Sequence, residues 1–345
     1  MTNQDSIAAL LRLIESRQTF LISSHARPDG DAIGSSVGLM HLLEAMGKRV
    51  CVAFADPIPE IFSCLEGVDR IVHRLPDEVP DVAILLECDS IQRTGFARIP
   101  AQLTVNIDHH LSGREYADFN WIDPHAAAVG ALVYDLAVAA RVPISTAMSD
   151  CLYAAVLTDT GSFNYPGTSA ATFALAGHLI QCGTDANRIA QAMFFTNPVG
   201  KIRLLGAALS NMHIKGEICW SVISQDDLAI AGATAEDCEG VVNHLISIAG
   251  IEAAVLLRQQ HDPNEYRLSL RSKGFGKLDV ARVAEHFGGG GHRTASGCTL
   301  HGTAAGIVER LLHYLHGALG EPGPAGTPHP AKPTAAPVSA PTLLA

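Results

Sequence analysis

The sequence predicts an α/β protein of two lobes, in which an N-terminal domain built on a parallel β-sheet precedes a smaller C-terminal α/β domain. The first observation is that short apolar strands alternate with helical segments, which is typical of a parallel sheet covered on both faces. The second is that this alternation changes near residue 214. The third is the length of 345 residues, which favours two hydrophobic cores over one.

The N-terminal domain begins with an amphipathic helix, predicted over residues 5–17. Four apolar residues fall on one face of it: Ile7, Leu10, Leu11 and Ile14. The apolar run TFLISS then predicts a buried strand, and the segment HARPDGD a turn before a helix over 32–46, which Gly47 ends. Further strands are predicted at 49–53, 82–86 and 103–107, and further helices at 129–140, 146–157, 170–181 and 185–194.

The C-terminal domain follows a break at Asn197 and Pro198 and a connecting helix over 202–212. Its strands are predicted at 218–223, 253–259, 265–272 and 298–300, with helices at 236–248 and 278–287. The expected boundaries are a metal-binding catalytic domain over 1–195, a connecting segment over 196–214, a substrate-binding domain over 215–318 and a tail over 319–345. The tail is rich in Pro and Ala, cannot bury a core and is expected to be disordered.

Composition limits the class of protein. Hydrophobic residues make up 48% of the chain and charged residues 17%, as in folded globular proteins. The N-terminus lacks the basic start and apolar run of a signal peptide, and no apolar run reaches the roughly 18–20 residues that span a bilayer. The expected location is the cytoplasm, with no membrane partner.

The chain is acidic but has one local exception. A net charge of −11 argues against a protein that coats long nucleic acid, including long duplexes. Residues 267–293, however, contain six basic residues and only two acidic ones, Asp279 and Glu285. The basic residues are Arg267, Arg271, Lys273, Lys277, Arg282 and Arg293. This cluster suggests a small anionic ligand, although a solvated face would have the same composition.

The eight cysteines are scattered, and none forms a Cys-x-x-Cys pair; they are Cys51, Cys64, Cys88, Cys151, Cys182, Cys219, Cys238 and Cys298. This spacing favours reduced core residues over disulfides or a zinc site.

Acidic and histidine residues follow four of the predicted elements. They are His25, Asp29 and Asp31 after the first strand, Asp89 after the third, Asp108, His109 and His110 after the fourth, and Asp159 after a helix. Because the carboxyl ends of parallel strands meet at one crevice, the first three groups are expected to lie close together. Each has an ordinary alternative: Asp31 a helix cap, Asp29 part of a turn, Asp89 a strand end, His109 a buried histidine. Their joint occurrence favours a site.

The residue types in this group indicate the chemistry. Carboxylates and imidazoles without thiolates suit Mn²⁺ or Mg²⁺ better than structural zinc. Several carboxylates in a small space repel one another unless cations lie between them. Two divalent ions about 3.5–4 Å apart can hold both the attacking and the departing oxygen of a phosphoryl group. The sequence therefore predicts a two-metal phosphoesterase.

A glycine-rich segment near the end of the second domain reads Phe287-Gly-Gly-Gly-Gly-His292-Arg293. Glycines let backbone N–H groups approach a ligand without obstruction by a Cβ atom, and such a loop can bind an anion. The alternative is a flexible connection between a helix and a strand. The basic pair after the glycines favours anion binding.

With these motifs, the chain resembles the DHH family of phosphoesterases that carry a DHH-associated C-terminal domain. The matching motifs are His25-x-x-x-Asp29-x-Asp31, Asp89, the triplet Asp108-His109-His110, Asp159 and the GGGGH of 288–292. The resemblance runs from about residue 18 to 318 and is strongest to short bacterial members that act as oligoribonucleases (nano-RNases) and 3′-phosphoadenosine-5′-phosphate (pAp) phosphatases. It implies two lobes with the active site in the cleft, two Mn²⁺ ions and a homodimer.

The resemblance also implies roles for individual residues. His25 and Asp29 hold one ion; Asp31, His109 and Asp159 hold the other; Asp89 bridges both. His110 lies near the attacked phosphate, and Asp108 orients the neighbouring histidines. The expected substrate-binding residues are Arg271, Ser272, Gly289, Gly290, Gly291, His292 and Arg293 in the second domain and Arg93 in the first, although Arg93 reads equally well as a surface residue near a turn. The segment with Thr160, Gly161 and Phe163 shapes the pocket in relatives.

The expected function is hydrolysis of short oligoribonucleotides to mononucleotides and removal of the 3′-phosphate of pAp. Within the same chemistry, the chain could instead be a phosphodiesterase for cyclic or linear dinucleotides, an exopolyphosphatase or a pyrophosphatase. From another class, it could be a non-catalytic nucleotide sensor. Polarity of attack and the preferred substrate are left open by the sequence.

Overall fold

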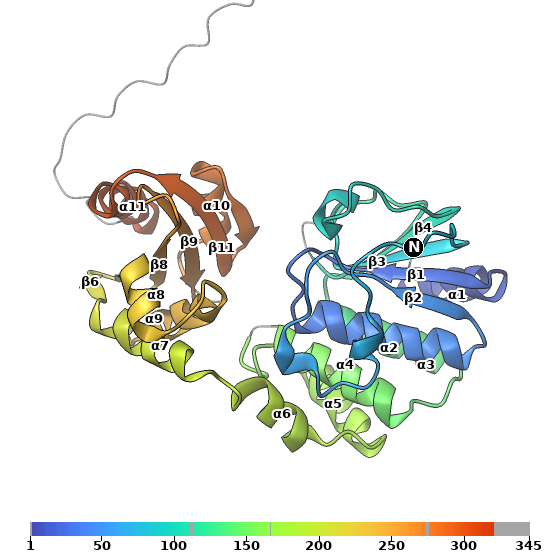
Figure 1. Ribbon diagram of the computed structural model, residues 1–345. Coiled ribbons are helices and arrows are strands. Elements are labelled where there is room, and N and C mark those ends of the chain that lie inside the picture. Colours follow the sequence, from blue (N-terminus) through green and yellow to red (C-terminus); the bar gives the residue numbers. More distant parts are fainter. Residues whose placement is uncertain (1, 111–112, 166, 274–275, 321–345) are drawn as a thin grey trace, which may run out of the picture. The chain divides into compact units, whose positions relative to one another are not determined.

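The computed structural model describes residues 2–110, 113–165, 167–273 and 276–320 (Figure 1). The chain divides into two compact units, Met1–Asn197 and Pro198–Ala345. Residues 321–345, nearly all of the tail expected to be disordered, lie outside the described part. Among the described residues, no helix is both long and apolar enough to cross a membrane.

Unit 1 contains a five-stranded, wholly parallel sheet. Its strands are β1 (Thr19–Ser23), β2 (Arg49–Val52), β3 (Val82–Leu86), β4 (Leu103–Asp108) and β5 (Phe119–Ile122). They lie in the order β2-β1-β3-β4-β5. Leu21 in the central part of the sheet pairs with Cys51 on one side and with Ala83 on the other. The sequence predicted the first four strands but not β5, which is short and mostly half-buried.

The order of the strands fixes the place of a site. From β1 the chain moves outward to β2 and then returns to the other side of β1 to form β3. A crevice opens at such a reversal, at the carboxyl ends of the strands. The residues that follow β1 and β3 therefore face each other there.

The helices of unit 1 are α1 (Asn3–Glu15), α2 (Gly30–Ala45), α3 (Val129–Ala139), α4 (Thr146–Asp159), α5 (Ala170–Gln181) and α6 (Ala186–Phe194). Figure 1 shows α2, α3 and α4 together on one side of the sheet, where they share the main core with it. The other face is covered on Leu21, Ala53 and Ala83 by apolar residues of irregular segments, among them Leu75 and Phe96. Both faces are covered, as predicted, but only one by helices.

Helices α2 and α4 approach each other closely because α2 presents glycine at every fourth position. A Cβ atom would lie 2.3 Å from the Thr158 side chain at Gly30, 2.4 Å from the Cys151 carbonyl oxygen at Gly34 and 2.6 Å from the Leu152 side chain at Gly38. The two helices therefore run antiparallel. This packing places Asp31, in the first turn of α2, beside Asp159, the last residue of α4.

Unit 2 contains a six-stranded mixed sheet. Its strands are β6 (His213–Lys215), β7 (Ile218–Ile223), β8 (Ala253–Gln259), β9 (Glu265–Ser272), β10 (Gly290–His292) and β11 (Ala295–His301), in the order β10-β11-β9-β8-β7-β6. Only β7 and β8 pair in parallel. Along β9 buried residues alternate with half-buried ones, so Leu268 and Leu270 enter one core while Arg267 and Arg271 point to the opposite face.

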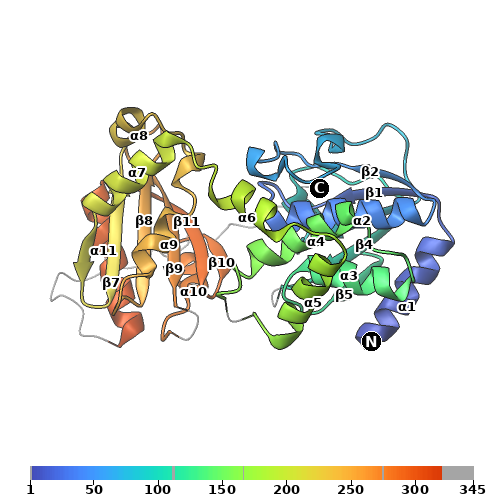
Figure 2. The same ribbon diagram turned by 90° about the horizontal axis from the view of Figure 1, so that it is seen from below.

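Helices pack on both faces of this second sheet. They are α7 (Val199–Ser210), α8 (Gln225–Ala231), α9 (Val241–Ile246), α10 (Val280–His286) and α11 (Ala304–Leu319). One core contains α10 and α11 and the other α7, α8 and α9, on opposite faces of the sheet (Figures 1 and 2). The expected connecting helix is α7, which packs into unit 2 through Leu204 and Ala208. The helix predicted at 236–248 is instead a short 3₁₀ turn, Glu236–Cys238, followed by α9.

Candidate metal centre and active site

Side chains from the carboxyl ends of β1, β3 and β4 meet the end of α4 in unit 1. Their possible ligand atoms fall into three groups, within each of which all atoms lie within 4.8 Å of one another. The groups are His25, Asp29 and Glu87; Asp31, Glu87, His109 and Asp159; and Glu87, His109 and His110. The structure thus brings together five of the six residues expected to bind metal, and it adds Glu87.

Glu87 lies at the centre of the cluster. Its side chain is only 2% exposed, with Oε2 3.7 Å from His25 Nε2 and Oε1 3.5 Å from His109 Nε2. The backbone N–H of Glu87 still donates to Ile107, so it continues the pairing of β3 with β4. Its φ of +57° is unusual for a residue with a Cβ atom, and such strain is typical of functional sites. Glu87 is therefore the residue that joins the two halves of the cluster.

Asp89, expected to bridge two ions, belongs to none of these groups among the described residues. It is the third residue beyond the end of β3, where its Oδ1 accepts a hydrogen bond from Ser90 at 3.0 Å and its Oδ2 lies 3.9 Å from Arg93. Asp89 therefore stays a predicted ligand, whereas Glu87, directly after the strand, is the residue whose carboxylate joins these groups. The predicted strand VAILL ends directly before Glu87, so the end of that strand already indicated Glu87 as a residue at the crevice.

Two histidines have the tautomer that a metal ligand needs. His25 Nδ1 is 3.0 Å from the carbonyl oxygen of Ala26, and His109 Nδ1 is 3.0 Å from that of Ala126. Since a carbonyl oxygen only accepts, Nδ1 carries the proton in both rings. Nε2 is then the atom of each ring that faces the carboxylates and would bind a metal ion, which is the arrangement in which histidine binds metals.

Backbone N–H groups hold two of the aspartates in place. Asp31 accepts hydrogen bonds from Val129 at 2.6 Å and Gly130 at 2.9 Å, at the N-terminus of α3. Asp29 caps α2, with Oδ1 accepting from Ala32 at 3.0 Å, and its Oδ2 lies 3.8 Å from His25 Nε2. The N-terminal cap of α2, for which the sequence offered Asp31, is therefore Asp29. A carboxylate oxygen has two lone pairs, so both side chains keep acceptor capacity for a cation.

Asp108 and His110 form a second, tightly held pair. His110 Nδ1 lies 2.6 Å from Asp108 Oδ1, which also accepts the backbone N–H groups of His109 and His110 at 2.8 and 3.0 Å. Asp108 is fully buried. Hydrogen bonds to the charged form outweigh the effect of burial and lower the pKa of Asp108. A charged Asp108 thus fixes the ring of His110.

The electrostatics of the cluster point to cations. Partial burial, with the nearby charge of Glu87, raises the pKa of Asp159 to about 7, and burial raises that of Asp31 well above its usual range. Burial disfavours a charged His109, but its contact with Glu87 and the charges of Asp31 and Asp159 raise its pKa to about 10. Without metal ions, these side chains bind protons, which reduce the repulsion between the neighbouring carboxylates.

The residues present fit divalent metal ions. Four carboxylates and two correctly oriented imidazoles converge, and the buried Oε2 atom of Glu87 has no hydrogen-bond partner among the described residues. Such an unsatisfied buried oxygen is costly unless another group, such as a cation, compensates it.

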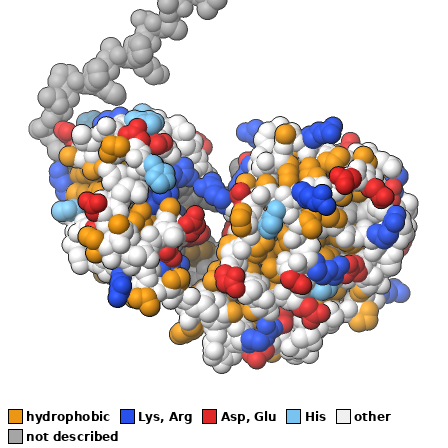
Figure 3. Space-filling view, viewed as in Figure 1, with side chains coloured by type: hydrophobic (Ala, Val, Ile, Leu, Met, Phe, Trp, Pro, Cys, Tyr) orange, Lys and Arg blue, Asp and Glu red, His pale blue; other side chains and the backbone are white. Residues whose placement is uncertain are grey.

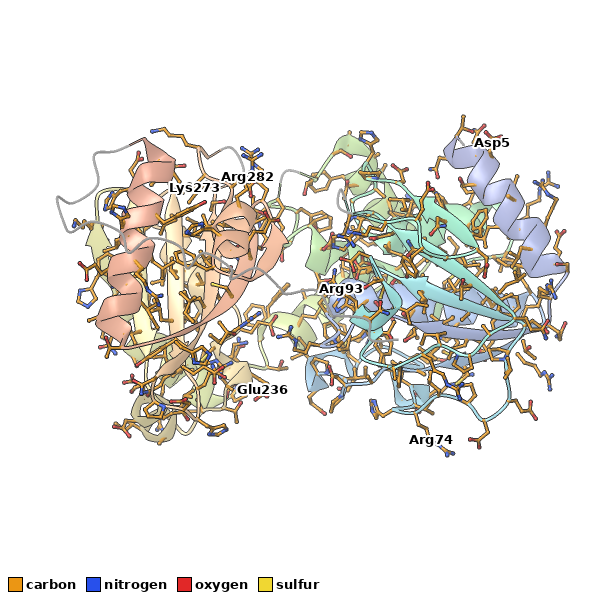
Figure 4. All side chains as sticks on the ribbon, turned by 90° about the horizontal axis from the view of Figure 1, so that it is seen from above. Asp5, Arg74, Arg93, Glu236, Lys273 and Arg282 are labelled. Atoms are coloured by element: carbon orange, nitrogen blue, oxygen red, sulfur yellow. The ribbon has the colours of Figure 1, made fainter. Side chains whose placement is uncertain are left out.

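Arg93, expected near the substrate, projects from the segment after β3 (Figure 4), with its guanidinium partly exposed. Its backbone carbonyl accepts a hydrogen bond from Ala26 at 2.6 Å, so this segment packs against the loop that carries His25. The structure therefore places Arg93 beside the cluster, close to Asp89.

The expected basic patch in unit 2 is only partly available for a ligand. Lys277 lies 3.5 Å from Glu217, Lys273 donates to the carbonyl of Ile248, and Arg282 points outward from α10 beside Asp279 (Figure 4). On the face shown in Figure 3, each unit carries side chains of both signs.

The other expected substrate-binding residues of unit 2 lie around β10. Ser272 is buried and donates to the carbonyl of Arg293, and Arg271 donates to Asn243. Arg293 is exposed, with only a long 3.4 Å contact to the carbonyl of Gly276. The side chain of His292 lies outside the described part.

The glycine segment was expected to be a loop, but part of it is a strand. Gly290–His292 forms β10, which pairs on one edge with β11. Gly289 and Gly291 allow a close approach to β11, because a Cβ atom would lie 2.2 Å from the Gly297 carbonyl at Gly289 and 2.5 Å from Ser296 at Gly291. Gly290 faces open space. No described strand pairs with the second edge of β10, which can therefore offer backbone N–H groups to a ligand.

Comparison with known proteins gives consistent matches over most of the chain. The DHH family, N-terminal domain, matches residues 19–156, and the DHHA1 domain matches residues 226–321. The bifunctional oligoribonuclease and PAP phosphatase NrnA of Bacillus subtilis is 30% identical over 300 residues, 85% of this chain and 92% of the relative. The protein of the same name from Thermus thermophilus is 30% identical over 321 residues, 92% of this chain and 94% of the relative.

A solved structure agrees with these matches. The exopolyphosphatase-related protein from Bacteroides fragilis superimposes with a TM-score of 0.85 at 28% identity, covering 92% of this chain and 98% of that one. Fold, site and matches together define a phosphoesterase. The chain belongs to the DHH family and carries the N-terminal DHH domain followed by a DHHA1 domain. The fold class and the resemblance predicted from the sequence are confirmed.

Proposed function

We propose that this DHH-family phosphoesterase uses two metal ions to hydrolyse short oligoribonucleotides to mononucleotides and to remove the 3′-phosphate of pAp. The observation that carries the proposal is the position of Glu87, which shares one ligand group with His25 and Asp29 and another with Asp31, His109 and Asp159. The substrates come from the named activities of the two similar NrnA proteins.

The donor set favours Mn²⁺, with Mg²⁺ as the alternative, because oxygen and imidazole ligands suit both. Ions bound here would polarise the phosphoryl group and lower the pKa of an attacking water. His25 and Asp29 would hold one ion, Asp31, His109 and Asp159 would hold the other, and Glu87 would serve both. The backbone N–H groups at the start of α3 hold the carboxylate of Asp31 in its orientation.

His110 acts on the phosphate. Asp108 accepts its Nδ1–H, so Nε2 is the ring atom left to face the phosphate, and with a proton on Nε2 as well it donates a hydrogen bond to a phosphate oxygen. That donation stabilises the negative charge that grows in the transition state. Asp108 acts through His110 and is a positioning residue.

Unit 2 recognises the far end of the substrate. Arg293, Arg271 and the backbone N–H groups along β10 bind a terminal phosphate, and Ser272 holds the carbonyl of Arg293. Arg93 binds the substrate from unit 1. A homodimer that acts in the cytoplasm stays a prediction.

The test is a turnover assay with four substrates, each with Mn²⁺ and with excess chelator. The substrates are a 5′-phosphorylated RNA dinucleotide, pAp, cyclic di-AMP and pyrophosphate. Chelator-sensitive turnover of the dinucleotide and of pAp is expected. Turnover of cyclic di-AMP or pyrophosphate alone would move the protein to another branch of the family's chemistry, and tight nucleotide binding without turnover would make it a sensor.

A further inference from the structure

The segment after Asp159 is a tightly folded turn in an unusual conformation. Gly161, Ser162 and Phe163 follow one another with φ values of +56°, +58° and +64°. For a bulky residue such as Phe163 a left-handed φ is a genuine outlier, and strain of this kind marks functional segments. The side chain and carbonyl of Thr160 hold the turn, accepting hydrogen bonds from the backbone N–H groups of Phe163 at 3.1 Å and of Tyr165 at 2.9 Å.

Two aromatic rings are exposed at this turn: Tyr165 belongs to the turn, and Phe173 of α5 packs on it. Phe163 is supported by Tyr153 of the core, with ring centroids 6.5 Å apart, and Phe173 of α5 stacks on Phe163 at 5.1 Å with an interplanar angle of 23°. Phe173 is nevertheless 57% exposed, and Tyr165 is 50% exposed. The Tyr165 ring lies over Gly161, where a Cβ atom would be 2.5 Å from the ring. Gly161 is therefore required for the position of this ring.

The turn that carries Tyr165, and Phe163 beneath Phe173, starts directly after a residue of the metal centre. The turn begins at the residue after Asp159, whose Oδ2 is 3.3 Å from His109 Nε2. Helix α5 packs beside α4, which ends at Asp159, and both views in Figures 1 and 2 show the two helices as neighbours. An ion at Asp159 and a planar group on the rings could thus belong to one small molecule with a phosphate and an aromatic base.

We propose that Phe173 and Tyr165, the aromatic shelf, bind a nucleobase of the substrate by stacking. This inference rests on the proposed function and names how the same site recognises its substrate. Stacking is tolerant of sequence because every base has an aromatic face. The turn is already rigid, so little conformational freedom is lost when a base binds. Because purines offer the larger face, adenine and guanine nucleotides bind more tightly than uracil and cytosine nucleotides.

A direct binding measurement separates the shelf from catalysis. 2-Aminopurine riboside 5′-monophosphate with Mg²⁺ is titrated with protein, since the fluorescence of 2-aminopurine falls when it stacks on an aromatic ring. Phe173→Leu is expected to weaken binding about tenfold, within the range for loss of one stacked base. Phe173→Tyr keeps a ring and is expected to bind like the wild type. The control is Ile180→Ala, an exposed apolar residue about 10 Å further along the same helix face.

Turnover then distinguishes failure of the shelf from failure of the proposed function. Phe173→Leu is expected to raise KM for a 5′-phosphorylated adenine dinucleotide, with no change for ribose 3′,5′-bisphosphate, which lacks a base. If the wild type hydrolyses nucleotides and Phe173→Leu changes neither quenching nor KM, the shelf is refuted and the phosphoesterase stands. If the wild type hydrolyses none of them, the proposed function fails while quenching still decides the shelf. A changed sedimentation coefficient in Phe173→Leu with unchanged quenching would show that the rings bind protein instead, which overturns the proposal.

Discussion

Gly34 on α2 lies so close to Cys151 on α4 that a Cβ atom on the glycine would be 2.4 Å from the carbonyl oxygen of the cysteine. The obstructing atom belongs to the backbone, so it cannot move aside as a side chain could. The same contact sets the distance between the two helices that carry Asp31 and Asp159. Stability and metal binding are therefore linked at this glycine.

Gly34→Ala is expected to lower the free energy of unfolding by about 2 kcal/mol, because overpacking a tight contact outweighs the better helix propensity of alanine. Urea unfolding measures it. The matched control is Gly177→Ala on α5, where a Cβ atom would meet nothing within 4 Å, and there a gain of about 0.5–1 kcal/mol is expected. A neutral Gly34→Ala would show that α2 and α4 can move apart without cost.

Glu87→Gln tests the bridging ligand. The amide keeps the shape of the side chain but removes its charge, so the variant should lose the rise in melting temperature that Mn²⁺ gives the wild type, together with at least 100-fold in turnover. Asp89→Asn should keep both, since Asp89 belongs to none of the ligand groups. The reverse pattern, with Asp89→Asn as the inactive variant, would restore the original sequence-based assignment.

The difference between Glu87 and Asp89 shows how far the sequence alone could go. Motifs and apolar strands predicted the first four strands, the order of the two domains and most residues of the cluster, because a local pattern identifies strand ends and the residues that follow them. The φ of Glu87 and the glycine contacts of α2 with α4 depend on tertiary packing, which no local pattern contains. β10 was predicted as loop because glycines disfavour strands, and pairing with β11 overrides that preference.

Asp108→Asn is expected to lower kcat about 10- to 100-fold while KM and the stabilisation by Mn²⁺ stay near wild-type values. The amide could present its NH₂ group to His110 Nδ1 and so turn the ring or change its tautomer. Steady-state kinetics and thermal melting with and without Mn²⁺ measure the two effects. Asp118→Asn is the control, because Asp118 binds Thr104 on the same sheet away from the ligand groups. Loss of Mn²⁺ stabilisation in Asp108→Asn would place Asp108 among the ligands instead.

The stability of the metal-free protein should fall as pH rises from about 5 to 10. The pKa of Asp159 is raised to about 7 in the folded state, so the folded protein holds a proton that the unfolded chain has released, and this advantage is lost as pH approaches 7. The pKa of His109 is raised to about 10, so its contribution is complete below its unfolded pKa and is lost as pH rises from there to 10. The pKa values of Glu87 and Asp108 are lowered in the folded state, so their contributions to stability increase with pH, but this change takes place below pH 5.

Unfolding in urea with chelator at pH 5.5, 7 and 9 measures this trend. Mn²⁺ should flatten or reverse it, because ions replace the protons and bind more tightly as the ligands lose them. Asp159→Asn should remove the contribution of Asp159 below pH 7 and also weaken the slope above it, because the charge of Asp159 helps to raise the pKa of His109. A metal-free stability that rises over this range would contradict the assignment of the cluster.

Arg293→Ala tests recognition by unit 2. Arg293 is exposed, and among the described residues its side chain makes only a long contact to the carbonyl of Gly276, so truncation to alanine should leave the fold intact. Loss of a charge-assisted contact to a terminal phosphate should raise KM about tenfold for a 5′-phosphorylated dinucleotide and far less for a small generic phosphodiester. Arg282→Ala is the control, because Arg282 projects from α10 with 82% of its side chain exposed, beside Asp279. Equal losses on both substrates would assign Arg293 a general electrostatic effect, and an unchanged KM would remove β10 and its neighbours from the substrate site.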